Sequence, residues 1–284
     1  MRRCSFKVLL AYILVLQGCG TLTPYVGQGP HPQIARGAWV PPVDFLGNVL
    51  ALPFKLVLWS WKFNNHAISS QTEARLIQYL DSEHWPAFKD TLYRLNQYHP
   101  LDDVRRLIRN HHVAWPYRLL LGLPATLITD VLLPGRVFPW GDYYNPYTNT
   151  GHLYSDDLVI ALHEAGHAYD FATVPYKGTY ALVRVVPFFD LGQEWQATET
   201  AVNYLEAIGD RDMEYHAYHV LWPAYGTYIG GYLPLPLGFI PGAVVGHVWG
   251  RLKARDKRKY YQRMDAALNA PNRRGSGNPQ PALP

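Results

Sequence analysis

The segment LVIALHEAGHAYDFATVP, residues 158 to 175, places two histidines and a glutamate within an otherwise apolar run. Such a run is expected to pack inside a folded domain, where polar groups without partners are costly. His163, Glu164 and His167 therefore need a common partner, and a metal ion would be one. The domain must then fold so that further ligands reach this segment.

A single helix is expected to carry these residues. Ser155 is a suitable N-cap, and Asp156 and Asp157 place negative charge in the first turn, where the helix dipole favours it. The helical pattern continues to about Thr173 and ends before Pro175.

The spacing of the histidines suits a metal site. His163 and His167 are four residues apart, so both imidazoles project from one face of the helix toward a single cation. Glu164 lies about 100° around the helix, where it can reach a water on the metal without being a ligand. This H-E-x-x-H pattern predicts zinc. The alternative without metal is a pair of histidines hydrogen-bonded within a core.

A catalytic zinc needs three protein ligands and an open position for water. The segment GQEWQATETAVNYLEAIGD, with Gly209 as a plausible C-cap, offers Glu194 and Glu199. Glu199 falls about 140° around the helix from Glu194, on the polar side. Glu194 is the predicted third ligand and Glu199 the reserve, because Glu194 shares the apolar stripe. The stripe consists of Ala197, Ala201, Leu205 and Ile208.

HEAGH followed by E-x-x-A on a later helix resembles the gluzincin class of zinc metallopeptidases. The resemblance implies a zincin-like core in which His163, His167 and Glu194 bind one Zn²⁺ and Glu164 is the general base. It also implies a peptide or protein substrate. The matching part covers about residues 149 to 208.

Two weaker expectations follow from the resemblance. NTGHLYS, residues 149 to 155, resembles the edge strand that aligns an extended peptide by strand addition. The position four residues after the third ligand is often acidic in these families, but here it is Thr198. Thr198 and Asp170 are therefore the residues considered for orienting a histidine, with Asp170 as the expected carboxylate partner.

The main alternative is a non-catalytic zinc-binding envelope lipoprotein with a structural or assembly role. A structural zinc site is usually closed by four protein ligands, and Asp170 or His216 would be the fourth. For the enzyme, the groups considered for stabilising an oxyanion are His216, His219 and Tyr204. His152 is expected to be a packing or surface histidine.

The N-terminus has the features of a bacterial lipoprotein signal. Three basic residues precede the apolar run 8–16, which is too short to span a bilayer but suits a signal peptide. The following Leu-Gln-Gly-Cys resembles a lipobox, so Cys19 is expected to carry the lipid anchor. Gly20 follows in place of an aspartate, which favours the outer membrane. The protein is expected to face the periplasm.

Charge argues against a nucleic-acid partner. The chain has 26 basic and 22 acidic residues, and removal of the three basic residues of the signal leaves 23 against 22. The mature protein is then nearly neutral, so the basic pI of the whole chain does not indicate nucleic acid.

The expected organisation is a signal peptide at 1–18, a Pro/Gly-rich leader at 19–44, a metallopeptidase domain at 45–265 and a disordered tail at 266–284. The domain is expected to be mainly α-helical, with a small β element before the active-site helix. That element is a short strand at 151–155.

Further elements are expected on both sides of this strand. Residues 100–115 and 116–135 are predicted helices, and residues 135–150 are a predicted loop rich in Gly, Pro and Asn. A polytopic intramembrane protease is less favoured, because Arg118 and Asp130 interrupt the second of these apolar segments.

Residues 215–250 contain no Asp, Glu, Lys or Arg, and glycines recur every four residues from Gly238 to Gly250. Three interpretations remain open: a membrane span, a membrane-contacting segment that does not span, and a buried helical hairpin. Four prolines argue against one continuous spanning helix. They are Pro223, Pro234, Pro236 and Pro241.

Overall fold

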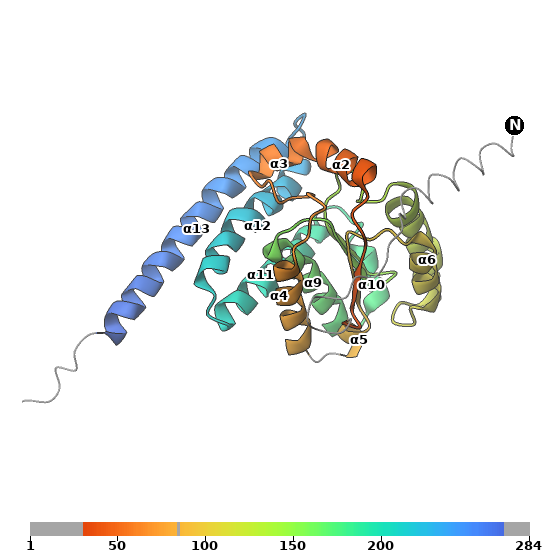
Figure 1. The fold of residues 1–284 in the computed structure, drawn as a ribbon, viewed down its shortest axis with the longest axis horizontal. Helices are drawn as coiled ribbons and strands as arrows, with labels where there is room; N and C mark the ends of the chain where they lie inside the picture. The colour runs from red at the N-terminus through yellow and green to blue at the C-terminus, as the bar shows by residue number, and fades with distance from the viewer. Residues whose placement is uncertain (1–30, 84–85, 270–284) are drawn as a thin grey trace, which may run out of the picture.

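The computed structural model describes residues 31–83 and 86–269, and the fold is mainly α-helical with one small sheet (Figure 1). The expectation of a mainly α-helical fold with a small β element is thereby confirmed. The strands are β1 (Ile34–Arg36), β2 (Leu92–Leu95), β3 (Tyr143–Asn145) and β4 (Thr150–Leu153). The predicted signal peptide and Cys19 lie outside the described residues, as does the predicted tail beyond residue 269.

Helices make up most of the chain, and two π-helical segments, η1 and η2, lie within one helical region. The helices before β3 are α2 (Pro41–Leu50), α3 (Leu52–Leu58), α4 (Ser70–Ser82), α5 (Pro86–Lys89), α6 (Pro100–Arg109), α7 (Trp115–Tyr117), η1 (Arg118–Gly122), α8 (Leu123–Thr126) and η2 (Leu127–Leu132). The helices after β4 are α9 (Leu158–Thr173), α10 (Lys177–Val183), α11 (Phe189–Ala207), α12 (Arg211–Gly231) and α13 (Phe239–Leu268). Both segments predicted to be helical thus contain helix. The first helix ends at Arg109, earlier than the predicted residue 115, and α7 to η2, residues 115–132, cover most of the second segment.

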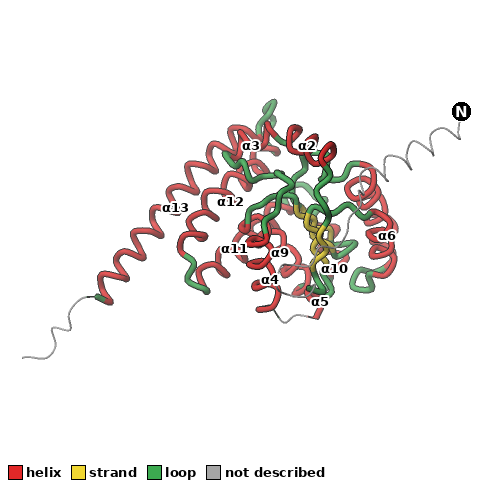
Figure 2. The backbone as a smooth tube through the Cα atoms, in the orientation of Figure 1, coloured by secondary structure: helices red, strands yellow, loops and turns green. Residues whose placement is uncertain are grey.

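The four strands form one mixed sheet in the order β1-β2-β4-β3. β1 and β4 both pair with β2 in parallel, and β3 pairs with β4 antiparallel. The sheet lies between α9 and α6 (Figure 2). β4 agrees with the predicted strand at 151–155, but β3 lies within residues 135–150, which were wrongly predicted to be a loop throughout.

The predicted boundary between leader and domain at residue 45 is also wrong. β1 and the start of α2 belong to the folded domain, although they lie within the predicted leader at 19–44. Asp44 of α2 is fully buried and accepts hydrogen bonds from Arg136, 2.7 Å from Nε and 2.9 Å from Nη2. A buried ion pair of this kind needs both partners in place, so this part of the leader is structural.

The crossing of α9 and α11 depends on Gly166, the glycine of HEAGH. A Cβ at position 166 would lie 2.7 Å from the carbonyl oxygen of Ala197 on α11. Ala197 is itself fully buried. The absence of a side chain at Gly166 therefore lets the two helices approach at the level of the histidines and Glu194.

Gly166→Ala is expected to lower the free energy of unfolding by ~1–3 kcal/mol, because the added methyl group meets backbone that cannot move freely. Gly192→Ala is the matched control, since a Cβ at Gly192 on the exposed side of α11 meets nothing within 4 Å. That substitution should stabilise the protein by ~0.5–1 kcal/mol. Urea denaturation measures both, and equal effects of the two changes would contradict the close crossing.

Residues 215–250 form most of α12 and the first half of α13, which pack as an antiparallel hairpin. Glycines line the contact between the two helices: a Cβ at Gly226 would lie 2.2 Å from the carbonyl oxygen of Gly242. A Cβ at Gly246 would lie 2.3 Å from the carbonyl oxygen of Trp222. The glycine repeat thus brings the two backbones together inside the protein.

The prolines do not all interrupt this hairpin as predicted. Pro223 lies inside α12, which continues past it, whereas Pro234 and Pro236 lie in the turn and Pro241 in the first turn of α13. Among the described residues, no single helix has the length and apolar composition to cross a bilayer. α2 and α3 together meet these criteria, but they bend by 48° at their junction.

Candidate metal centre

α9 carries the two histidines as predicted, but its N-cap is Asp157 rather than Ser155. The Asp157 carboxylate accepts a hydrogen bond from the backbone N–H of Val159 at 3.1 Å. The Ser155 hydroxyl instead donates to Asp142 and accepts from the backbone N–H of Asn64. Ser155, which the local sequence predicts as the N-cap, therefore forms its hydrogen bonds with residues outside this helix.

The imidazoles of His163 and His167 lie together, with ring centroids 4.7 Å apart and planes at 83°. Nε2 of His163 lies 3.1 Å from Oε2 of Glu194, and Nε2 of His167 lies 3.3 Å from Oε1. Ligand atoms of the three residues all lie within 4.8 Å of one another. The structure thus brings together the three residues predicted to bind zinc.

These distances fit a zinc ion. Ligand atoms ~2.0–2.1 Å from a tetrahedral Zn²⁺ are separated from one another by about 3.3 Å. Nε2 of His167 is buried and has no hydrogen-bond partner, although it faces the Glu194 carboxylate. A cation among these three residues would satisfy that nitrogen.

The charge states of His167 and Glu194 also suit metal ligands. Burial lowers the pKa of His167 to about 4, so its imidazole is neutral at pH 7. Burial opposes ionisation of Glu194, but His167 and Arg184 outweigh it and hold its pKa well below the usual range. A neutral imidazole and an ionised carboxylate are the forms that bind metal.

Thr198 orients His163. Its hydroxyl lies 3.3 Å from Nδ1 of His163, one turn of α11 beyond Glu194. When Nε2 of a histidine binds metal, Nδ1 carries the hydrogen and donates it to an outer partner. Asp170 does not take this role, because its carboxylate interacts with the hydroxyl of Tyr180.

Arg184, just beyond the end of α10, is a site residue that the sequence did not reveal. Its Nη2 lies 3.1 Å from Oε1 of Glu194, and its Nη1 lies 3.4 Å from Nδ1 of His167. Binding of metal through Nε2 would place a hydrogen on Nδ1, so Arg184 would then keep only its contact with Glu194. Arg184 therefore holds the Glu194 carboxylate in position from outside the ligand group.

Glu164 lies beside the ligand group and is buried, with Oε2 lacking a hydrogen-bond partner. Burial raises its pKa to about 8, and the nearby Glu194 and Asp142 carboxylates act in the same direction. A cation held by His163 and Glu194 would oppose this shift by attracting the carboxylate. Glu164 thus has a free oxygen beside the ligand group, and a bound cation would favour the ionised form that can accept a proton.

A pocket of ≈ 240 Å³ opens over Glu164, His163 and Glu194. Most other lining residues are apolar or aromatic and come from α3, α12 and the segment before β3, which also contributes Asp142. They include Phe54, Leu58, Trp140, Tyr225 and Tyr228. The ligand group therefore borders this pocket.

Tyr228 is the second residue that the sequence did not single out. It lines the pocket with its side chain 41% exposed, and the Glu194 carboxylate raises its pKa well above the usual range. Its hydroxyl therefore remains protonated and can donate. The groups considered earlier do not line this pocket: His216 lies 2.8 Å from the Asp157 carboxylate, and Tyr204 packs against Tyr79. His219 lies on α12 and is also not among the lining residues.

Glu199, the reserve ligand, is half-buried on α11 and is not part of the ligand group. The expectation that residues 149–155 form an edge strand is also wrong, because β4 is an inner strand of the sheet. β4 has β2 on one side and β3 on the other, so its backbone hydrogen-bonding groups are already used within the sheet. The sheet edge nearest to β4 is β3, and an extended peptide cannot pair with residues 150–153.

A second group, formed by Asp103, Asp130 and His152, could also hold a cation. It lies in a buried polar layer beside the sheet, away from α9. Asp103 already accepts from Arg94 at 2.9 Å, and Asp130 from Asn145 at 2.8 Å. These partners occupy the carboxylates, so the group on α9 and α11 is the better metal site. His152 is buried, in agreement with a packing role.

No family model, curated protein or solved structure matches this chain.

Proposed function

We propose that this protein is a zinc-dependent metallopeptidase with a zincin-like core. His163, His167 and Glu194 would bind one Zn²⁺, and Glu164 would be the general base. The observation that carries the proposal is the convergence of three ligand atoms within 4.8 Å beneath a pocket that Glu164 also lines. The lipobox at Cys19 supports a place in the cell envelope, anchored by lipid and facing the periplasm.

Bound zinc would lower the pKa of a coordinated water toward ~7 and polarise the scissile carbonyl. Glu164 would take the proton of the attacking water and pass it to the leaving amine, a role supported by its Oε2, which has no hydrogen-bond partner. Thr198 and Arg184 keep His163 and Glu194 oriented. Tyr228 can donate a hydrogen bond to the oxyanion that forms on the carbonyl.

A structural role for zinc is the weaker candidate. It would require a fourth protein ligand, and Asp170 and His216 were the residues considered. Asp170 interacts with Tyr180, and His216 pairs with Asp157. Within residues 31–83 and 86–269, the group around Glu194 contains three ligands and no fourth. An open coordination position favours catalysis.

Purified protein is expected to contain one zinc per chain by atomic absorption and to cleave members of a random peptide library. Removal of the metal with 1,10-phenanthroline should abolish cleavage, and added Zn²⁺ should restore it. X-ray absorption spectroscopy of the zinc should show two imidazoles, one carboxylate and water. A fourth protein ligand without peptide cleavage would instead establish the structural role.

A further inference from the structure

The first half of α13 exposes a surface that is apolar up to Gly250 and is interrupted by Arg251. Its outward residues, Ile240, Val244, Val245, Val248, Trp249 and Leu252, are each at least 40% exposed. At 100° per residue they cover about half of the helix circumference. The opposite half packs on α12 through Gly242, Gly246 and Gly250. A helix of a water-exposed hairpin would carry polar residues on its outer half, and the outer half of this one carries none before Arg251.

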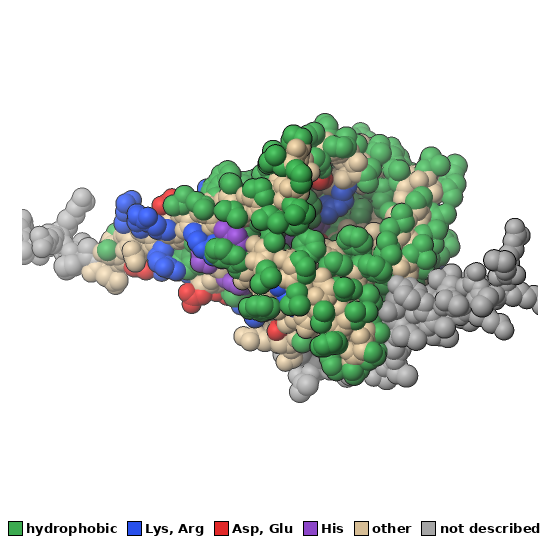
Figure 3. All heavy atoms as spheres, turned by 90° about the horizontal axis from the view of Figure 1, so that it is seen from above, with side chains coloured by type: hydrophobic (Ala, Val, Ile, Leu, Met, Phe, Trp, Pro, Cys, Tyr) green, Lys and Arg blue, Asp and Glu red, His purple; other side chains and the backbone are tan. Residues whose placement is uncertain are grey.

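The apolar surface continues onto neighbouring elements. The turn between α12 and α13 exposes Leu235 and Leu237, and α2 and α3 expose Phe45 and Leu56. α3 packs against α13, with Phe54 stacked on Phe239 at 6.0 Å between ring centroids. Figure 3 shows hydrophobic side chains spread over this side of the molecule. We call the exposed residues of α2, α3, the turn and α13 up to Leu252 the apolar face.

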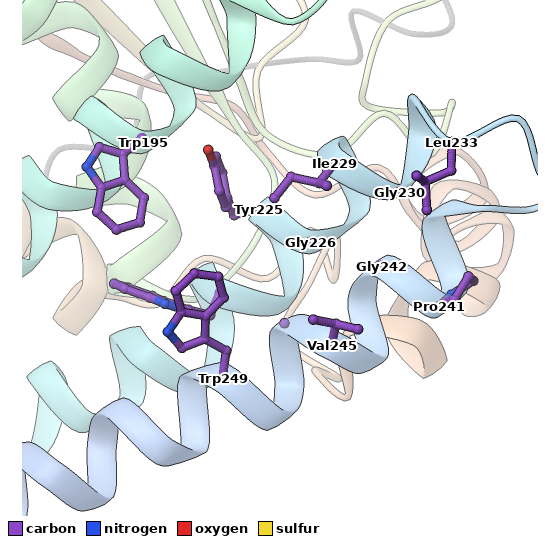
Figure 4. A pocket seen from close by; sticks show the side chains of 12 residues that line it. Trp195, Tyr225, Gly226, Ile229, Gly230, Leu233, Pro241, Gly242, Val245 and Trp249 are labelled. Carbon is purple, nitrogen blue, oxygen red and sulfur yellow. The ribbon is translucent and has the colours of Figure 1, made fainter.

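An apolar pocket of ≈ 170 Å³ adjoins the apolar face between α11, α12 and α13. Trp195, Tyr225 and Trp249 surround it, and their rings are directed toward the pocket (Figure 4). A cavity with such a lining suits a hydrocarbon chain better than a polar ligand.

Charge appears abruptly at one border of the apolar face. Between residues 251 and 268, α13 carries seven Lys or Arg and two Asp, directly after the charge-free segment. Figure 3 shows the basic side chains gathered at the end of the molecule formed by this half of α13. At the border, the guanidinium of Arg251 lies 4.6 Å from the ring centroid of Trp59. Tryptophan and arginine are typical of the level of lipid headgroups.

We propose that the apolar face docks onto an anionic lipid bilayer. The apolar side chains enter the boundary between headgroups and acyl chains, and the basic half of α13 contacts the headgroups. The bilayer is the occupant that combines an apolar interior with a negatively charged surface, as the face requires. This inference does not rest on the metal site.

Photocrosslinking to lipid tests the proposal. Leu237 and Phe45 are 63% and 66% exposed and belong to different elements of the face. Each would be replaced in turn by p-benzoylphenylalanine in the full chain, reconstituted with vesicles of phosphatidylethanolamine and phosphatidylglycerol. Asp81, at the end of α4 with a side chain 65% exposed, is the matched control position. Mass spectrometry identifies what each position has captured after irradiation.

We expect lipid adducts at Leu237 and Phe45 and no lipid adduct at Asp81. Equal lipid capture at all three positions would show that the anchor alone holds the protein near lipid, and would overturn the proposal. So would crosslinked dimers of this chain at Leu237 and Phe45, or no adduct at either. The two positions are independent, so misfolding of one variant leaves the other to decide.

Discussion

Glu164→Gln is expected to lower the rate of peptide hydrolysis by at least ~10²-fold while the zinc content stays near one per chain. Glutamine keeps the size of the side chain and can still form a hydrogen bond, but it cannot accept the proton of the attacking water. Glu164 is not part of the ligand group, so the metal should remain. Initial rates on one peptide and zinc analysis of the same sample measure both quantities.

Glu199→Gln is the matched control for this prediction. The same chemical change is made on α11 at a half-buried position outside the pocket and outside the ligand group. Its rate and zinc content should equal those of the wild type. A Glu164→Gln protein that cleaves at the wild-type rate would exclude Glu164 as the base, and one that loses zinc would make it a ligand.

The positions of the histidines could be predicted because helical periodicity is local. His163 and His167 share a face in any regular helix, whatever the rest of the chain does. Glu194 was predicted because it heads a stripe of small apolar residues, of which Ala197 and Ala201 are indeed buried. Ile208, at the other end of the stripe, is exposed, because α11 has already ended at Ala207.

Arg184 and Tyr228 could not be predicted in the same way. Arg184 follows a short helix, and its contact with Glu194 depends on how the segment between α10 and α11 turns. Tyr228 reaches the pocket from α12, and nothing in its own segment distinguishes it from neighbouring tyrosines. Residues placed by tertiary packing leave no periodic pattern in the sequence.

Strands β1 and β2 were missed for a related reason. β1 has three residues and β2 four, and both pair with strands distant in the sequence. β2 also contains Arg94, a charged residue that interrupts its apolar pattern. Arg94 can nevertheless be buried because it pairs with Asp102 and Asp103 on α6. These ion pairs involve a segment later in the chain. From its own sequence, a short strand that contains an arginine is therefore predicted to be an exposed segment.

Glu194→Ala is expected to remove the bound zinc. The carboxylate faces Nε2 of both His163 and His167, and no other described residue supplies a third ligand to this group. Changing an outer partner of a metal ligand weakens binding ~10–100-fold, so removal of a ligand should weaken it by more than ~10²-fold. Competition with a fluorescent zinc chelator measures the affinity, and peptide hydrolysis should be lost with the metal.

Glu199→Ala separates loss of a ligand from general damage to α11. Both glutamates lie on the same helix, but Glu194 is 1% exposed and contacts the histidines, whereas Glu199 is half-buried on another side. Zinc affinity should therefore fall only in Glu194→Ala. If Glu199→Ala also lost zinc, the ligand would have been assigned to the wrong face of α11. If Glu194→Ala kept its zinc, the two histidines would bind metal with a group other than this carboxylate, and the open position inferred for catalysis would no longer follow.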